Sequence, residues 1–392
     1  MPSELDLLIS TRRDLHRHPE LGFEEHRTAG IVAERLRAAA YAVRTGIAGT
    51  GVVGTMRGGA GEGPTLLLRA DMDALPVQEE TAHGFPSTVA GKMHACGHDA
   101  HVAIGLAVAE RLARRRAEWP GEVRYCFQPA EEGAGGAQRM IEEGALQGVD
   151  AALGLHVWLG LPKGVVGVVD GPQMAGAREF RIVVHGRGGH GAIPQETIDA
   201  TLVASHVVVA LQSIVSRNVS PLDTAVVTVG SFHAGTAQNV IAETAVLQGT
   251  LRAFRAELLE ELKAHLERVT GGVCAALGAR AEVSYSPIAY PPTVNDPAMA
   301  GIVRRAAAGV VGEERVRSDD DVRTMGAEDF AEFGARVPGC FFFVGARDEA
   351  IGAVYPHHSP RFDLSEEALP VAVEVLERAA LGYLRGGAGV GS

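Results

Sequence analysis

The order of the predicted strands and helices is the feature that most constrains the fold of this chain. Strand-like apolar segments at residues 63–71, 122–133 and 151–158 alternate with helical segments at residues 102–119 and 137–146. Such an alternation is typical of a mostly parallel sheet with helices on both faces. We therefore expect an α/β domain in the N-terminal part of the chain.

The middle of the chain has a different order of elements. Between residues 178 and 290, the apolar patterns follow the order β-α-β-β-α-β, which is that of a ferredoxin-like α+β unit. Alternating helix and strand patterns then resume, and 392 residues are in any case too many for one ordinary core. We predict an α/β domain formed by residues 1–177 and 291–392, interrupted by an inserted domain at residues 178–290.

Composition excludes several classes of partner. The formal net charge of −12 disfavours binding to nucleic acid and to anionic membranes, because both require a basic surface. We identify no secretory signal and no apolar stretch long enough to span a membrane. Cys96, Cys126, Cys274 and Cys340 are too few for a disulfide framework in a chain of this length. These observations predict a cytoplasmic protein.

Five short segments carry side chains that are typical of metal sites. They contain Asp71 and Asp73 (RADMDALP), Cys96 and His98 (MHACGHDAH), Glu131 and Glu132 (PAEEG), His156 (GLHV), and His357 and His358 (PHHSP). An isolated His or Cys is usually an ordinary core or surface residue. Several of these side chains, however, follow predicted strands, and sites in parallel sheets form at the strands' carboxyl ends. Together, these ligand types predict a metal-dependent enzyme with a zinc-like divalent cation.

The spacing within two of the segments predicts how the roles are divided. Gly97 separates Cys96 from His98, and a bent loop with this spacing lets both side chains share one cation. Glu131 and Glu132 are neighbours in a segment that we expect to be extended, so their side chains point apart. One can then bind metal while the other acts on a water as a general base. The alternative is that both are exposed surface acids.

The chain resembles the M20 peptidase family, and within it the amidohydrolases that act on N-acyl amino acids, hippurate and auxin–amino acid conjugates. The resemblance extends over nearly the whole chain. It is carried by RRDLHRHPELGFEE, RADMDALPVQE, KMHACGHDAHVAIGL, FQPAEEGAGGAQRMIEEG, GLHV, GRGGHGAIP, AGTAQNVIAETAVLQGTLRAF, MGAEDFAEF and HHSPRFD. ACGHDAH together with PAEEG is highly specific, whereas GRGGH alone would be a weak signal.

The resemblance implies roles for individual residues. A centre of two divalent ions, zinc or manganese with cobalt and nickel as alternatives, would be bound by Cys96, His98, Glu132, His156 and His358. Glu131 is implied as the general base, and Asp73 as a residue that orients a metal ligand. His358 is preferred to His357 because it directly precedes Ser-Pro, as in the family motif. The role of Asp71, where other branches carry a His ligand, stays open.

The resemblance also gives the inserted domain a role as a lid and dimerisation domain. His190 and Asn239 are implied as contacts to the substrate, and a hydrogen-bond donor there would stabilise an oxyanion. The alternative for His190 is a hydrogen-bonded turn residue in a glycine-rich loop. We expect a homodimer or a higher homo-oligomer, in which His190 serves either its own subunit or its partner.

The implied function is hydrolysis of the amide bond in a small N-acyl amino acid. Two alternatives use the same machinery: a metallo-dipeptidase, or a deacetylase of an N-acetylated biosynthetic intermediate. A third is a metal-dependent binding protein that has lost catalysis. The sequence does not predict the acyl group, the amino acid or the native metal.

Overall fold

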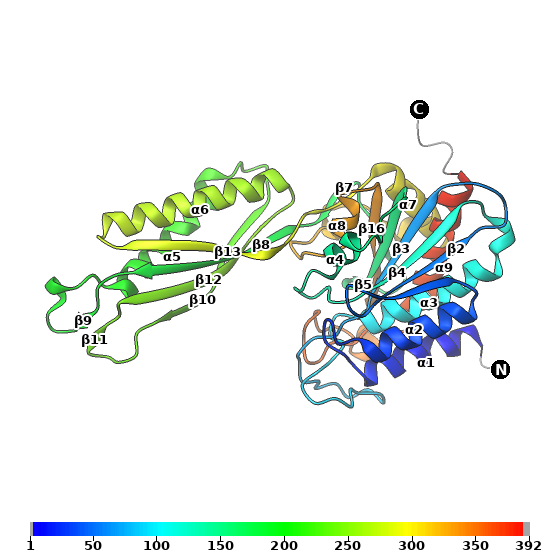
Figure 1. Ribbon diagram of the computed structural model, residues 1–392, viewed down its shortest axis with the longest axis horizontal. Coiled ribbons are helices and arrows are strands. Elements are labelled where there is room, and N and C mark those ends of the chain that lie inside the picture. The colour runs from blue at the N-terminus through cyan, green and yellow to red at the C-terminus, as the bar shows by residue number, and fades with distance from the viewer. Residues whose placement is uncertain (1–2, 387–392) are drawn as a thin grey trace. The chain divides into compact units, whose positions relative to one another are not determined.

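The computed structural model describes residues 3–386, which form two compact units (Figure 1). The first unit contains the chain up to Gln173, the segment Thr293–Arg323 and the chain from Asp329 onwards. The second unit contains Met174–Pro292 and also the short segment Thr324–Glu328. The second unit is therefore an insertion in the first, and the grouping of residues 324–328 with it is a feature that the sequence did not indicate.

An eight-stranded sheet forms the centre of the first unit, with the strand order β1-β2-β4-β3-β5-β16-β6-β15. Its strands are β1 (Ala42–Ile47), β2 (Gly51–Arg57), β3 (Thr65–Asp71), β4 (Glu122–Gln128), β5 (Ala151–Pro162), β6 (Val166–Gly167), β15 (Val316–Arg317) and β16 (Gly339–Arg347). The four central strands β4, β3, β5 and β16 are parallel to one another, whereas β1 and β2 pair antiparallel. The predicted mainly parallel sheet is confirmed.

The central strands are apolar along almost their whole length. Every residue of β3 from Leu66 to Asp71 is buried, and so is β16 from Gly339 to Ala346. Strands that are covered on both faces have such continuous apolar runs. Asp71 therefore lies at the end of a fully buried strand, where a carboxylate needs partners.

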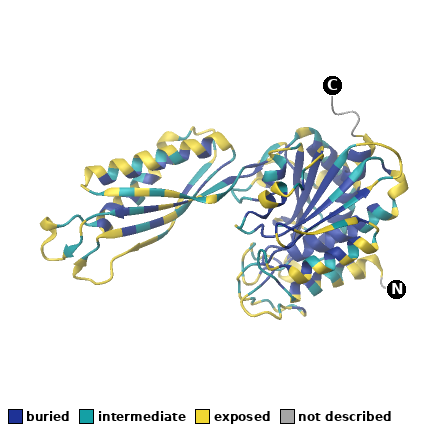
Figure 2. Cartoon of the chain, in the orientation of Figure 1, coloured by how far each residue is buried: buried dark blue, intermediate teal, exposed yellow. Residues whose placement is uncertain are grey.

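Helices pack around this sheet. They are α1 (Glu4–Arg17), α2 (His26–Ala38), α3 (His98–Arg114), α4 (Gly136–Glu142), α7 (Pro297–Val311), α8 (Ala331–Gly334) and α9 (Ala368–Gly386). α3 is buried along most of its length between α1, α9 and the sheet (Figure 2). β7 (Gly171–Met174) and β14 (Thr293–Asn295) form a separate two-stranded sheet.

The structure corrects three predicted boundaries near the metal-binding segments. β5 extends beyond the predicted residues 151–158 and pairs with β16 as far as Pro162, so His156 lies within the strand and not at its end. α3 already begins at His98, which is therefore helical and not part of the preceding loop. Glu131 and Glu132 lie in a turn after β4 and not in an extended segment.

The second unit has the predicted ferredoxin-like topology. Its elements are β8 (Gly176–His185), α5 (Ala200–Asn218), β10 (Ala225–Ala234), β12 (Thr244–Ala253), α6 (Ala256–Ala276) and β13 (Arg280–Tyr290). The strands form an antiparallel sheet in the order β10-β12-β8-β13. α5 and α6 pack together and against the strands, and this unit has its own core of side chains such as Ile182, Leu211 and Leu262.

Within the described residues, α5 is the one helix long and apolar enough to cross a membrane by length and composition. This finding corrects the expectation that no stretch reaches that length. Val203, Val207 and Leu211 of α5 belong to the core of the second unit, and Asp199 caps its N-terminus. Core helices of soluble units meet the same criterion, so the finding is only a weak indication of a membrane.

Candidate metal centre

The five side chains predicted as ligands lie in one connected cluster of the first unit. Cys96 Sγ is 3.4 Å from His156 Nε2. Glu132 Oε1 is 4.0 Å from His98 Nε2 and 3.2 Å from His358 Nε2. Ligand atoms of Cys96, His98 and Glu132 also lie within 4.8 Å of one another. The fold therefore brings together side chains from the start of α3, the turn after β4, strand β5 and the loop after β16.

Gly97 allows Cys96 and His98 to approach β5. Its φ of 91° lies in the left-handed region that favours glycine, and it precedes the first residue of α3. A Cβ atom at this position would lie 2.6 Å from Cγ2 of Val157, the neighbour of His156. The bend at Gly97 therefore gives two candidate ligands a close approach to a third.

His98 directs one ring nitrogen toward Glu132. Its Nδ1 lies 3.2 Å from Asp73 Oδ1, and since a carboxylate only accepts hydrogen bonds, the Nδ1 nitrogen carries a proton. His98 Nε2 and Glu132 Oε1 are both buried, and neither has a hydrogen-bond partner within residues 3–386. Buried polar atoms without partners are costly. A divalent cation between these two atoms would satisfy both.

The charge around His98 supports the same conclusion. Burial lowers the pKa of His98, but the carboxylates of Asp71, Asp73 and Glu132 outweigh burial and raise it to about 10. In the metal-free protein, a proton thus takes the place that a cation would occupy. A bound cation would reverse this preference and leave Nε2 as a ligand.

Cys96 faces a second imidazole with a defined tautomer. His156 Nδ1 lies 2.6 Å from the carbonyl oxygen of Val157, so Nδ1 carries the proton and Nε2 presents its lone pair to Cys96. Burial, together with the carboxylates of Glu132 and Glu131, raises the pKa of the Cys96 thiol well above its ordinary value. Metal binding by Cys96 would therefore release a proton.

The turn after β4 separates the two glutamates. Ala130 has a φ of 54°, which is unusual for a residue other than glycine and is typical of functional sites. Glu131 is buried, and its Oε1 accepts a hydrogen bond of 3.4 Å from the backbone N–H of Asp329. Glu132 instead faces His98 and His358. The two carboxylates thus have different surroundings, as a division between base and ligand requires.

Asp73 links two of the candidate ligands. Its Oδ1 accepts from His98, and its Oδ2 accepts a 3.0 Å hydrogen bond from the backbone N–H of Glu132. A single carboxylate thereby fixes the His98 ring and the turn that carries Glu132. These contacts are those of an orienting residue.

Asp71 and His101 form a network that the sequence did not predict. Asp71 pairs with Arg69 at 2.5 Å and accepts a 2.6 Å hydrogen bond from His101 Nδ1. His101 Nε2 in turn accepts the backbone N–H of Val157 at 3.0 Å. Both nitrogens of His101 are therefore engaged, and the network supports β5 beside His156. The spacing of His98 and His101 on one face of a helix was the available signal.

His357 and His358 both reach the cluster. His357 is partly buried and its Nδ1 lies 3.9 Å from Cys96 Sγ. The His358 side chain is 54% exposed and contacts Glu132. His358 also has a φ of 68°, a second strained residue at this site.

The predicted substrate contacts lie together in the second unit. β9 (Gly189–His190) pairs with β11 (Val240–Ile241), and the N–H of Gly191 donates to the carbonyl oxygen of Asn239 at 2.8 Å. His190 Nδ1 accepts the N–H of Ala192 at 3.0 Å, so its proton is on Nε2. His190 and Asn239 are both exposed.

A separate cluster of metal-ligand types contains His16, Glu79 and His83. His16 Nδ1 contacts Asp99 Oδ2 at 2.9 Å, and Glu79 Oε2 accepts the N–H of Ser87 at 2.6 Å. His83 Nε2 contacts the hydroxyl of Thr81 at 3.1 Å. Each of these side chains thus has a hydrogen-bond partner in the protein, although His83 Nδ1 has none within residues 3–386.

Comparisons with known proteins add to these observations. The model of Peptidase family M20/M25/M40 matches residues 67–382. The chain is 40% identical over 367 residues to thermostable carboxypeptidase 1 of Saccharolobus solfataricus, which covers 93% of this chain and 92% of that protein. It is 42% identical over 376 residues to an N-acetylcysteine deacetylase of Bacillus subtilis, and this match covers 95% of this chain and 96% of that protein.

A solved structure is similar over the whole length. The Bacillus subtilis YXEP protein, described as a dinuclear metal-binding peptidase from the M20 family, superimposes with a TM-score of 0.84. It is 37% identical, and the match covers 97% of this chain and 99% of that one.

Proposed function

Because this chain belongs to peptidase family M20/M25/M40 and is a metal-dependent hydrolase, we propose that it cleaves the amide bond of N-acyl amino acids. The observation that carries the proposal is the pair of buried atoms His98 Nε2 and Glu132 Oε1, neither of which forms a hydrogen bond within residues 3–386, next to the buried carboxylate of Glu131. The similarity to an N-acetylcysteine deacetylase supports an acylated amino acid as the substrate class.

The proposed ligands of a two-ion centre are Cys96, His98, Glu132, His156 and His358. A thiolate and imidazoles favour zinc, with manganese, cobalt and nickel as alternatives. When bound, such ions would polarise the scissile carbonyl group and lower the pKa of a water molecule. Asp73 orients His98 and the turn of Glu132 through the hydrogen bonds described above.

Glu131 is the proposed general base. Its carboxylate takes a proton from the attacking water and later gives it to the amine nitrogen as the C–N bond breaks, so that one residue serves both proton transfers. The hydrogen bond from Asp329 holds one oxygen of the carboxylate in place. The close packing of Glu131 also limits competing contacts with bulk water.

His190 and Asn239 are the proposed substrate contacts of the second unit. Because His190 Nδ1 accepts the N–H of Ala192, its Nε2–H is the donor available to an oxyanion. We propose that catalysis requires the two units to close on the substrate. We propose a homodimer or higher homo-oligomer, in which the second unit pairs with its copy.

A peptide substrate is the second candidate, favoured by the 40% identity to a thermostable carboxypeptidase. A substrate panel separates the two. We expect metal-reconstituted protein to hydrolyse N-acetyl amino acids or hippurate with a higher kcat/KM than dipeptides. Glu131→Gln protein loaded with the same metal is the control against contaminating hydrolases. A preference for dipeptides would contradict the proposal, and metal-loaded protein that hydrolyses nothing in the panel would indicate a binding protein.

A further inference from the structure

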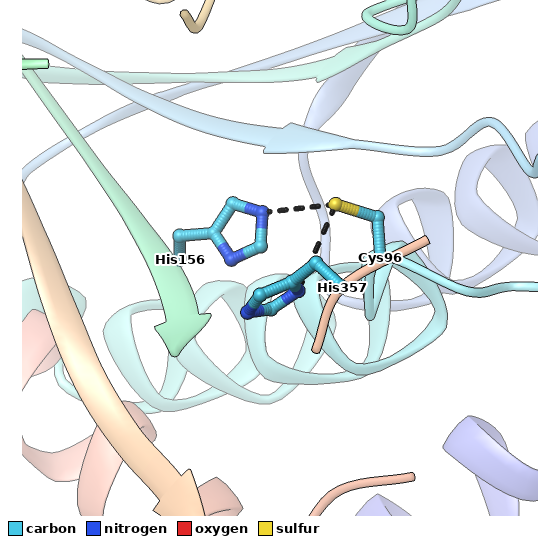
Figure 3. Close-up of side chains that lie close together, drawn as sticks. All are labelled: Cys96, His156 and His357. Atoms are coloured by element: carbon cyan, nitrogen blue, oxygen red, sulfur yellow. Dashed lines mark hydrogen bonds between the residues drawn. The ribbon is translucent and has the colours of Figure 1, made fainter. Parts of the chain in front are cut away.

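Two imidazole rings face the sulfur of Cys96 (Figure 3). His156 Nε2 is 3.4 Å from Sγ, and His357 Nδ1 is 3.9 Å from it. Only His156 has a role in the proposed centre. The hydrogen bonds on the far side of each ring decide what each ring offers to the sulfur.

His156 offers a lone pair. Its Nδ1 donates to the carbonyl oxygen of Val157 at 2.6 Å, and the Nε2 atom that faces Cys96 can therefore bind a cation.

His357 instead presents an N–H group to the sulfur. The backbone N–H of Leu159 donates to His357 Nε2 at 3.2 Å, so Nε2 must hold a lone pair. An imidazole in that state carries its single proton on Nδ1, and Nδ1 is the atom that faces Cys96. The two rings thus differ in tautomer because one is fixed by a backbone acceptor and the other by a backbone donor.

Packing holds the His357 ring in this orientation. It stacks on Trp158 with ring centroids 4.7 Å apart and an interplanar angle of 23°. The rings of His156 and Phe362 each lie 5.0 Å away. Rotation of the ring would disturb these contacts and the hydrogen bond from Leu159.

We propose that His357 is a positioning residue whose Nδ1–H donates a hydrogen bond to the Cys96 thiolate and which does not itself bind metal. This inference rests on the proposed metal centre. A donor at this position would offset the negative charge that the thiolate adds beside Glu131 and Glu132. It would also orient the sulfur toward the side that His156 occupies.

Two measurements test the inference. The first is nitrogen NMR of the metal-free wild type with ¹⁵N-labelled histidine, in which the His357 signals are identified by their loss in a variant. We expect the proton on Nδ1 and none on Nε2. A proton on Nε2 would overturn the inference, whatever the metal centre does.

The second measurement uses the cobalt-loaded protein. His357→Phe keeps a ring that can stack on Trp158 but removes both nitrogens, and His357→Asn keeps an amide donor near the Nδ1 position. We expect the Phe variant to bind the full complement of cobalt, to shift the thiolate-to-cobalt absorption band to longer wavelength and to lose affinity by about 10- to 100-fold. The Asn variant should restore the band. His83→Phe, a change of a partly buried ring outside the centre, should leave it unchanged.

The outcomes separate the two proposals. Loss of one cobalt ion in both His357 variants would make His357 a ligand and overturn the inference, as would an unchanged band and affinity in His357→Phe. Wild-type protein that binds no cobalt would overturn the metal centre, and this inference with it.

Discussion

At the scale of single residues, hydrogen bonds on one side of an imidazole decide what the other side can bind. Asp73 and the carbonyl oxygen of Val157 place protons on Nδ1 of His98 and His156, which leaves each Nε2 toward the proposed ions. His101 lies one helical turn from His98 but has both nitrogens engaged. Residue type alone therefore does not separate ligands from supporting residues.

The first prediction concerns the proposed base. Glu131→Gln should lower kcat by at least about 10²-fold, because the amide cannot accept the proton of water. Metal content, measured by elemental analysis, should stay near that of the wild type. Glu132→Gln is the matched control and should lose metal. Loss of metal from Glu131→Gln would show that the two glutamates have exchanged roles.

The second prediction concerns the thiol of Cys96. Chelation should abolish activity and make Cys96 newly reactive to alkylation, whereas Cys126, Cys274 and Cys340 stay protected because they are buried in apolar cores. Since burial and nearby carboxylates raise the pKa of Cys96, its alkylation should be slow near neutral pH and accelerate as the pH rises. Peptide mapping by mass spectrometry measures both effects. Equal reactivity with and without metal would exclude Cys96 as a ligand.

The site residues that stand together in short motifs could be predicted from the sequence, whereas hydrogen bonds between residues far apart in the chain could not. The proposed ligands stand in short motifs, several of which were expected at strand ends, and such positions can be predicted to converge. The hydrogen bond between Asp71 and His101 could not be predicted in this way, because His101 lies on α3. The other ring nitrogen of His101 accepts from the backbone of Val157 in β5. Hydrogen bonds between distant elements leave no local pattern.

At the scale of elements, both the backbone conformation and the packing at the start of α3 require a glycine. Gly97 combines a left-handed φ with a position where a Cβ would clash with Val157. The sequence indicated a bend here but not that His98 begins the helix. Strands β1 and β2 were also not predicted, because their apolar patterns are short. β1 pairs antiparallel with β2, and β2 pairs antiparallel with β4.

The third prediction separates strain from packing at Gly97. Gly97→Ala should lower the free energy of unfolding and weaken metal affinity, because the new methyl group pushes Cys96 and His98 away from β5. Gly91→Ala is the matched control, since Gly91 also has a positive φ of 73° but no other atom lies within 4 Å of the position that a Cβ would take there. The control should cost about 1–2 kcal/mol of unfolding free energy without affecting metal affinity. Similar metal affinities in the two variants would contradict the packing argument.

At the scale of the whole molecule, the chain divides the proposed work between two units. The proposed metal ligands belong to the first unit, and the proposed substrate contacts His190 and Asn239 belong to the second. The order of elements predicted a separate inserted unit, because apolar patterns of four strands and two helices in ferredoxin-like order interrupt the α/β pattern. The sequence did not predict that residues 324–328 belong to the second unit, since that segment has no regular apolar pattern.

The fourth prediction concerns cooperation between units. His190→Ala should lower kcat strongly and leave metal content unchanged, because His190 is proposed to contact only substrate. Mixed dimers of His190→Ala and Glu131→Gln chains then test which subunit His190 serves. If it serves the partner, one site in each mixed dimer has both residues and activity returns in part. Verified mixed dimers without activity would exclude that assignment and leave His190 acting within its own chain.

The most direct test of the metal centre is anomalous diffraction at the absorption edge of the metal that restores activity. We predict two peaks per chain, each about 2.0–2.3 Å from ligand atoms drawn from Cys96, His98, Glu132, His156 and His358. Peaks at His16, Glu79 and His83, or none beside Cys96 and His98 in a fully active crystal, would contradict the account.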